Sequence, residues 1–236
     1  MKKIIVIILI VLFVYLIYIF NDKNLIDYMV IGDSISLGIN SYGNKTYGYN
    51  DYLKTYLENN NLLHKYNNYF SKNSYTIEEL TNDINNNKDI LYNDKTYNIR
   101  KELREADLLT ISIGMDELVK ILNQDNIDFQ NIKEYLDKNI KNMDILLKKI
   151  TELSKSKIIL LGYYNPSNNY NSNIDSIFAY LNTEYTKLCK KYNISYVDIY
   201  GIIKKNQNCL PNNFDYHLTS RGYLKIANNI IEKNNL

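Results

Sequence analysis

The sequence contains few of the residues that mark specialised classes of protein. Only two cysteines occur among its 236 residues, and their spacing fits no metal-binding motif. Glycine and proline are also scarce, with 8 and 2 residues, and neither an internal repeat nor a long linker is visible. Positive and negative side chains nearly balance, at 28 against 26, so nothing in the composition indicates a nucleic acid or an acidic partner.

Small residues are absent from the N-terminus, where no Ala, Gly or Ser occurs between Met1 and Ile31. An unbroken apolar run extends instead from Ile4 to Phe20. At about 1.5 Å per residue, a helix of this length reaches roughly 25 Å, near the lower limit for a membrane span. A signal peptide with a cleavage site of the A-x-A type is disfavoured, and no Cys follows that a lipid could modify. The sequence favours an uncleaved signal anchor, with a secreted protein as the alternative if cleavage occurs.

The charges beside the apolar run predict its orientation. Lys2 and Lys3 precede it, and positive residues tend to remain in the cytoplasm. We therefore expect a single-pass protein of the cell membrane whose remaining part faces the extracellular side. Residues 1–24 would form the anchor and a short tether, and residues 25–236 are enough for one domain with a substantial core.

Short apolar runs alternate with amphipathic segments, which predicts an α/β fold with a mainly parallel five-stranded sheet. In open sheets of this kind, ligands bind beyond the carboxyl ends of the strands. The expected strands are 27–31, 65–70, 108–113, 157–161 and 195–199, and the expected helices are 48–59, 76–86, 98–105, 115–123, 131–154, 174–192 and 220–233.

Two short motifs at opposite ends of this domain supply a serine, a histidine and a carboxylate. Gly32-Asp33-Ser34 follows the first predicted strand, and Asp215 and His217 precede the last predicted helix. Side chains two residues apart in an extended segment point to the same side, so Asp215 is expected to bond one imidazole nitrogen while the other faces Ser34. Either motif alone is weak, since Gly-Asp-Ser is also a common helix start. Together they indicate serine catalysis.

These motifs and their positions resemble the GDSL/SGNH hydrolase family, over roughly residues 27–236. The first family block is matched by Ile31-Gly32-Asp33-Ser34-Ile35-Ser36, and the last by Asp215-x-His217-Leu218-Thr219-x-x-Gly222-Tyr223. The resemblance implies a flavodoxin-like three-layer α/β/α sandwich.

The resemblance also implies a site. Ser34 would be the nucleophile, His217 the base and Asp215 its orienting partner. Family members cleave carboxylic esters, thioesters and acetyl groups on glycans or lipids without a metal or another cofactor. We therefore expect a small-molecule, glycan or lipid ester as substrate, the membrane as a partner through residues 4–20, and no nucleic acid.

The two middle blocks of the family depart from the usual pattern. Where the family has a Gly whose backbone N–H faces the oxyanion, this chain places Ser74, which keeps the donor if it adopts the required backbone angles. Where the family has an Asn donor, this chain has Asp116, and an ionised carboxylate has no hydrogen to donate. Ser34, Ser74 and Asp116 are thus the expected oxyanion-hole positions. Asp116 leaves an alternative open: a catalytically impaired member that binds a surface glycan or lipid.

Three further features each admit two interpretations. Cys189 lies on an apolar helical stripe and is either a small core residue or paired with Cys209 in a disulfide. The segment 162–166 either lines a substrate pocket with its tyrosines or is an ordinary turn after a strand. His64 is expected to be a surface or structural histidine.

Overall fold

The computed structural model of the chain describes residues 25–236, except 124–128, 167–171 and 212–214. The predicted membrane anchor, residues 4–20, lies outside the described residues. Within the described part, no helix has both the length and the apolar character required to cross a bilayer. The anchor therefore stays a prediction, and the structure concerns the domain that follows it.

A parallel five-stranded sheet forms the centre of the fold, as the alternating pattern predicted. Its strands are hydrogen bonded in the order β2-β1-β5-β6-β7. The central strand β5 is buried along its whole length, which explains why its sequence is a nearly continuous apolar run. The strands are β1 (Ile26–Gly32), β2 (Leu63–Asn67), β5 (Leu108–Ser112), β6 (Lys157–Leu161) and β7 (Ser195–Val197).

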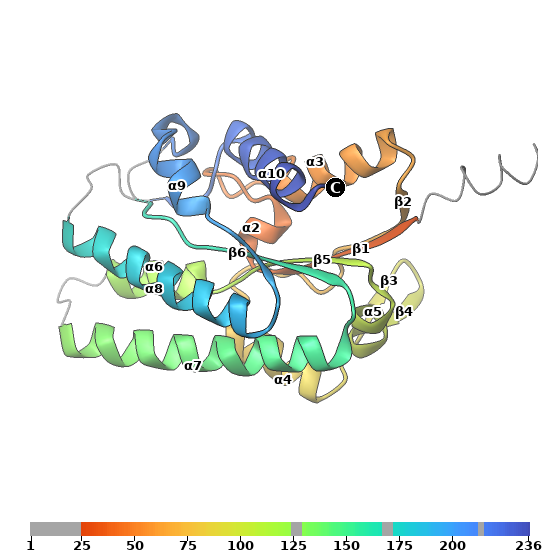
Figure 1. Cartoon of the computed structure of the whole chain (residues 1–236), viewed down its shortest axis with the longest axis horizontal. Coiled ribbons are helices and arrows are strands. Elements are labelled where there is room, and N and C mark those ends of the chain that lie inside the picture. Colours follow the sequence, from red (N-terminus) through yellow and green to blue (C-terminus); the bar gives the residue numbers. More distant parts are fainter. Residues whose placement is uncertain (1–24, 124–128, 167–171, 212–214) are drawn as a thin grey trace, which may run out of the picture.

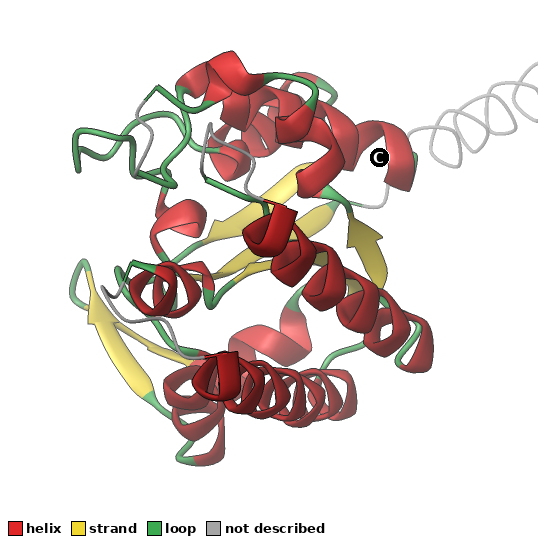
Figure 2. Ribbon diagram, turned by 90° about the vertical axis from the view of Figure 1, so that its left-hand side faces the viewer, coloured by secondary structure: helices red, strands yellow, loops and turns green. Residues whose placement is uncertain are grey.

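Helices cover both faces of the sheet (Figure 1). In that view α3, α9 and α10 lie above the sheet, and α4, α7 and α8 lie below it; Figure 2 shows the strands between the two layers. The helices are α2 (Ser34–Leu37), α3 (Tyr49–Asn59), α4 (Ile77–Asn85), α5 (Ile99–Glu105), α6 (Met115–Leu122), α7 (Phe129–Leu153), α8 (Ser172–Lys191), α9 (Ile199–Lys204) and α10 (Ser220–Asn234), with a short 3₁₀ turn at Gln207–Cys209.

Local hydrogen bonds explain where several elements begin and end. Thr76 and Glu79 form a capping box at the start of α4, each side chain accepting from the other residue's backbone N–H at 3.0 Å. The second strand was expected to reach residue 70 but ends at Asn67. The Asn67 side chain there accepts from the backbone N–H of Tyr69 at 2.9 Å, which turns the chain.

The sequence prediction missed a small antiparallel hairpin between α4 and α5. Its strands are β3 (Asp89–Tyr92) and β4 (Lys95–Asn98), and they pair outside the main sheet. Asn93 and Asp94 form the connection with φ angles of 49° and 59°. Two residues in this left-handed region make the tight turn that matches the twist of a hairpin. The Asn-Asp pair between Ile90-Leu91-Tyr92 and Lys95-Thr96-Tyr97, two short segments with residues that favour strands, is the signal that could have revealed it.

Both cysteines belong to the core and carry free thiols. Cys189 and Cys209 are 1% and 0% exposed. Burial raises the pKa of the Cys189 thiol to about 12, so it behaves as a small apolar side chain. The structure thus agrees with the core interpretation of Cys189 and contains no bond between the two sulfurs.

Candidate active site

The strand order places a topological switch point next to the first motif. From β1 the chain continues to α3 on one face, and from β5 it continues to α7 on the other (Figure 1). At such a switch point the carboxyl ends of neighbouring parallel strands open a cleft that α/β proteins use for ligands. Ser34 directly follows β1 and Gly114 follows β5, so two of the predicted site segments meet at this place.

The turn that presents Ser34 depends on glycine. A Cβ on Gly32 would lie 1.8 Å from the carbonyl oxygen of Ser112, so no other residue permits this approach of β1 to β5. Asp33 then caps α2 by accepting from the backbone N–H of Ile35 at 3.1 Å. Ser34 is the first residue of α2, where backbone N–H groups have no partner within the helix.

The terminal motif forms the predicted carboxylate–imidazole pair. His217 Nδ1 lies 2.6 Å from Asp215 Oδ1, which also accepts the backbone N–H of His217 at 2.9 Å. An ionised carboxylate only accepts, so the bonding proton sits on Nδ1 and Nε2 keeps a lone pair. Nε2 is buried and has no hydrogen-bond partner among the described residues. This is the state that a general base needs.

Tyr216 joins the two motifs across the fold. Its hydroxyl lies 3.1 Å from Ser34 Oγ, and its ring centroid lies 4.2 Å from that of His217. The fold therefore brings Ser34 to the segment that carries Asp215 and His217, and the hydrogen bond of its Oγ is to Tyr216 and not to the imidazole. Nucleophile–base bonds often tighten only when substrate is bound, so this geometry is compatible with a resting enzyme.

Ser74 has the backbone conformation that the glycine of the family would supply. Its φ angle is 53°, in the left-handed region. The segment before it continues the sheet: Ser71 bridges to Gly32, and the N–H of Lys72 donates to the Gly32 carbonyl at 3.0 Å. The second block thus runs next to the Ser34 turn, and Ser74 adopts a left-handed backbone conformation of the kind that glycine favours.

Two buried acidic side chains, one from the first block and one from the third, interact next to the Ser34 turn. Asp116 is 5% exposed in the first turn of α6, and its Oδ2 has no hydrogen-bond partner in the described part of the chain. Burial, and then the charge of Asp116, raise the pKa of Asp33 to about 8. Asp33 also accepts from the backbone N–H of Met115 at 3.3 Å. A carboxylate therefore stands where the resemblance places an amide donor.

Two tyrosines after β6 form hydrogen bonds to the backbone of the loops that carry the site residues. The Tyr163 hydroxyl donates to the carbonyl of Ile113 at 2.8 Å, and a Cβ on Gly114 would lie 2.2 Å from it. The Tyr164 hydroxyl donates to the backbone carbonyl of Tyr216. Both side chains are buried, at 3% and 2% exposure, and their hydrogen bonds brace the loops of the site. The sequence signalled only their position after a strand.

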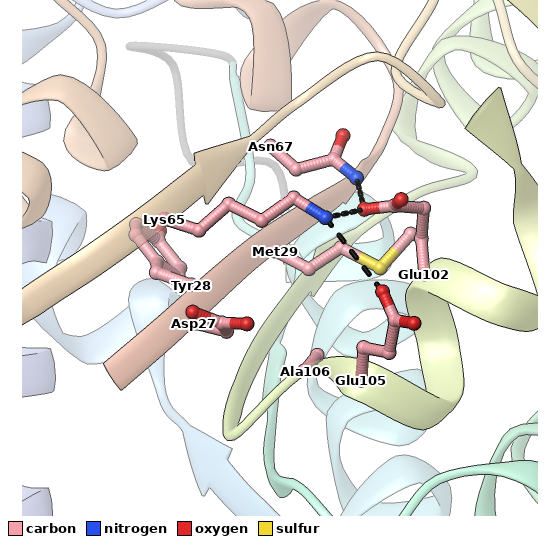
Figure 3. A pocket seen from close by; sticks show the side chains of 8 residues that line it. All are labelled: Asp27, Tyr28, Met29, Lys65, Asn67, Glu102, Glu105 and Ala106. Atoms are coloured by element: carbon pink, nitrogen blue, oxygen red, sulfur yellow. Dashed lines mark hydrogen bonds and ion pairs between the residues drawn. The ribbon is translucent and has the colours of Figure 1, made fainter. Parts of the chain in front are cut away.

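A second polar cluster lies near the start of β1 (Figure 3). Lys65 Nζ lies 2.7 Å from Glu102 and 3.8 Å from Glu105, and Asn67 donates to Glu102 at 2.5 Å. Burial lowers the pKa of Lys65, but the hydrogen bond to Glu102 and the negative charges of Glu102, Glu105 and Asp27 together outweigh this effect, and the pKa is raised. The cavity measures 10 Å³, room for about one water. Because its charges are paired, we interpret this cluster as structural.

The described residues include no group of three or more His, Cys, Asp or Glu side chains placed to hold a metal ion. The chemistry derived below uses only the serine, histidine and carboxyl groups already described.

Comparison with known sequences identifies the family. A sequence model of the GDSL-like lipase/acylhydrolase family matches residues 28–230. This range covers most of the chain, including both terminal motifs, and the chain therefore belongs to that family. It is accordingly a hydrolase of the GDSL esterase or lipase type, as the motifs predicted. Among curated proteins, no match to the chain was found.

Solved structures confirm the fold. The lipase Lip_vut3 from a goat rumen metagenome superposes with a TM-score of 0.73 at 22% identity, over 88% of this chain and 96% of that one. Axe2, an acetylxylan esterase from Geobacillus stearothermophilus, gives a TM-score of 0.67 at 18% identity, over 91% of this chain and 97% of that one. At these identities the similarity establishes the SGNH-type fold, with its five-stranded parallel sheet.

Proposed function

We propose that this protein is a membrane-anchored serine esterase that hydrolyses carboxylic esters on the extracellular side, with Ser34, His217 and Asp215 as its triad. The observation that carries the proposal is the contact between the ends of the domain. The Asp215–His217 pair has a free Nε2, and the intervening Tyr216 touches Ser34 Oγ. If Gly32-Asp33-Ser34 served only to start α2, no histidine with an oriented and unpartnered nitrogen would be needed in the segment that contacts Ser34.

The proposed reaction proceeds through an acyl-enzyme. Ser34 Oγ attacks the ester carbonyl while its proton moves to His217 Nε2, and Asp215 stabilises the imidazolium that forms. Collapse of the tetrahedral intermediate releases the alcohol, which takes the proton from His217. Water, activated by the same imidazole, then hydrolyses the acyl group. The backbone N–H groups of Ser34 and Ser74 would stabilise the oxyanion in both steps.

The proposed substrates are acyl or acetyl esters of lipids or cell-surface glycans. The names of the similar structures, a lipase and an acetylxylan esterase, support both parts of this range. The test is hydrolysis of nitrophenyl esters with short and long acyl chains by the full-length protein in detergent, together with covalent labelling by a fluorophosphonate. Labelling needs an activated serine but not the natural ester. Absence of both hydrolysis and labelling would contradict the proposal and favour a catalytically impaired module that binds a glycan or lipid.

The anchor is the part of the proposal that concerns location. We expect residues 4–20 to remain in the mature protein, since no small-residue cleavage site accompanies them. Mass spectrometry of the native membrane fraction should find a chain that retains this segment, and protease added to intact cells should digest the domain. A mature chain that begins near Asn21 or later and is released into the medium would show instead that the protein is secreted.

Asp116→Asn is expected to raise kcat, by up to about 100-fold if the amide supplies a full oxyanion donor. The gain should appear in kcat more than in KM, because the donor acts on charge present mainly in the transition state. Turnover rates measured against substrate concentration check this. An unchanged kcat would show that Asp116 does not face the oxyanion.

The same variant should also change how stability depends on pH. The folded-state pKa of Asp33 is raised from 3.8 to about 8, so the native protein binds this proton more tightly than the unfolded chain. The contribution of this proton to the free energy of unfolding is present at acidic pH, and it is lost as the pH rises from 3.8 to about 8. Asp116→Asn removes one cause of the shift, so its Tm relative to wild type should increase from acidic to mildly alkaline pH. Glu58→Gln, at an exposed position of α3, is the control.

A further inference from the structure

The third block of this chain lacks the side-chain donor that the oxyanion needs. Asp116 has a carboxyl group where an amide is expected, and its charge is one cause of the raised pKa of Asp33. A negative group near the reacting carbonyl opposes the oxyanion that develops there. The loss of one hydrogen-bond donor to the oxyanion lowers the rate by roughly 100 to 1,000-fold. An efficient esterase therefore requires a neutral donor from another part of the fold.

Tyr216 offers such a donor directly at the nucleophile. Its hydroxyl is 3.1 Å from Ser34 Oγ, and the residue is 9% exposed. A phenol keeps its proton at neutral pH and donates one hydrogen bond. The other expected oxyanion donors are the backbone N–H groups of Ser34 and Ser74. The hydroxyl of Tyr216 is the side-chain group that forms a hydrogen bond with Ser34 Oγ.

The position of the Tyr216 ring is fixed by contacts on two sides. Its backbone carbonyl accepts a hydrogen bond from the buried Tyr164, and its ring packs against that of His217 with an interplanar angle of 32°. Tyr164 comes from the loop after β6, a different part of the chain. A donor held in this way needs little reorganisation during the reaction, which is the condition for effective stabilisation of transition-state charge.

From this geometry we propose that Tyr216 is a catalytic residue that donates to the oxyanion in place of the amide missing at Asp116. The inference rests on the proposed esterase function. The Tyr216 hydroxyl lies 3.1 Å from Ser34 Oγ, so an ester carbonyl that reaches Oγ comes next to this hydroxyl. The hydroxyl then exchanges Oγ for the carbonyl oxygen as its acceptor.

The step balances without any further reactant. The bond from Ser34 Oγ to the carbonyl carbon forms, the Oγ proton moves to His217 Nε2, and the carbonyl π pair becomes the oxyanion lone pair. Tyr216 donates a hydrogen bond to this oxygen and retains its proton. When the pair returns to carbon, the alcohol leaves with the proton from His217, and Tyr216 again has Ser34 Oγ within reach.

Tyr216→Phe tests the proposal, because it removes the hydroxyl and keeps the ring beside His217. We expect kcat to fall by roughly 100 to 1,000-fold with little change in KM, and fluorophosphonate labelling to slow as well. The matched control is Tyr28→Phe. Tyr28 is also buried, and its hydroxyl pairs with that of Thr110 at 2.9 Å within the sheet. This control is expected to keep wild-type kcat even if its Tm falls.

A rescue experiment separates a donor from a structural role. Asp116→Asn in the Tyr216→Phe background should recover roughly tenfold or more of the lost rate, and the gain should exceed that of Asp116→Asn alone. An equal gain in both backgrounds, or wild-type kcat in Tyr216→Phe, would overturn the proposal. Faster turnover or labelling in Tyr216→Phe would also overturn it and show that the hydroxyl blocks Ser34. A wild-type protein that neither turns over esters nor labels would instead reject the esterase function itself.

Discussion

Ser34→Ala is expected to abolish ester hydrolysis, with a loss of kcat of roughly 10⁶-fold, and to abolish fluorophosphonate labelling completely. Without Oγ there is no atom to form the acyl-enzyme, and only slow attack by water remains. The fold should survive. The change leaves the Tyr216 hydroxyl without its partner on Ser34, which costs about 1 to 3 kcal/mol. Turnover, labelling and a thermal melt of the purified variant are the three measurements.

A neighbouring serine provides the control for this variant. Ser36 is also buried in α2, but its hydroxyl donates to backbone carbonyls of Ile31 and Ser112, each at 3.2 Å. Ser36→Ala should lower Tm while leaving labelling in place. If Ser34→Ala labels as strongly as wild type, Ser34 is not the nucleophile, and the serine that carries the label can be identified by peptide mapping.

His217→Ala is expected to lose nearly as much activity as Ser34→Ala, again roughly 10⁶-fold in kcat, because members of a triad act as a unit. Without the imidazole, no group takes the proton from Ser34 during attack or returns it to the leaving alcohol. The double variant with Ser34→Ala should therefore be hardly worse than either single variant. Additive losses would show that the two residues do not act in one step.

The other histidine of the chain, His64, provides a well-matched control for His217→Ala. His64 Nδ1 also lies 2.6 Å from an aspartate, Asp27, but this pair is at the start of β1 and the His64 side chain is 64% exposed. The sequence prediction of a surface histidine is thus confirmed. His64→Ala removes the same kind of pair far from the carboxyl ends of the strands, and kcat should not change. A large loss in His64→Ala would mean that the effect of His217→Ala reports folding and not catalysis.

Much of the fold could be predicted because its signals are local. The apolar run of β5 and the amphipathic pattern of α7 each follow from a few consecutive residues, and the helix bounds agree closely with the structure. The sequence also extended the last strand to residue 199, whereas β7 ends at Val197 and Ile199 begins the unpredicted helix α9. Two other errors were local in origin. The side chain of Asn67 ends β2 early, and the φ angles at Asn93 and Asp94 make an unforeseen hairpin. In both cases short polar side chains act on the backbone in a way that hydrophobic periodicity does not register.

The site was predictable only in part, for a related reason. The Asp215–His217 bond joins residues two positions apart, so the sequence could anticipate it. In an extended strand, side chains alternate between the two sides, and Tyr216 would then point away from the side that Asp215 and His217 share. There was therefore no reason in the sequence to place Tyr216 at the site. In the structure this segment is an irregular loop, and alternation does not apply.

Taken alone, the sequence determined the α/β class, the family and the positions of Ser34, Asp215 and His217, because these depend on short motifs and on strand ends. Tertiary structure decided which groups meet beyond the carboxyl ends of the strands. Tyr216 reaches Ser34 across 182 positions, and Asp33 reaches the backbone of Met115 across 82. Such contacts are set by how closely packed loops fill the space at the carboxyl ends of β1, β5 and β6. A shift of a few tenths of an ångström there makes or breaks a hydrogen bond, and no residue pattern within one segment encodes it.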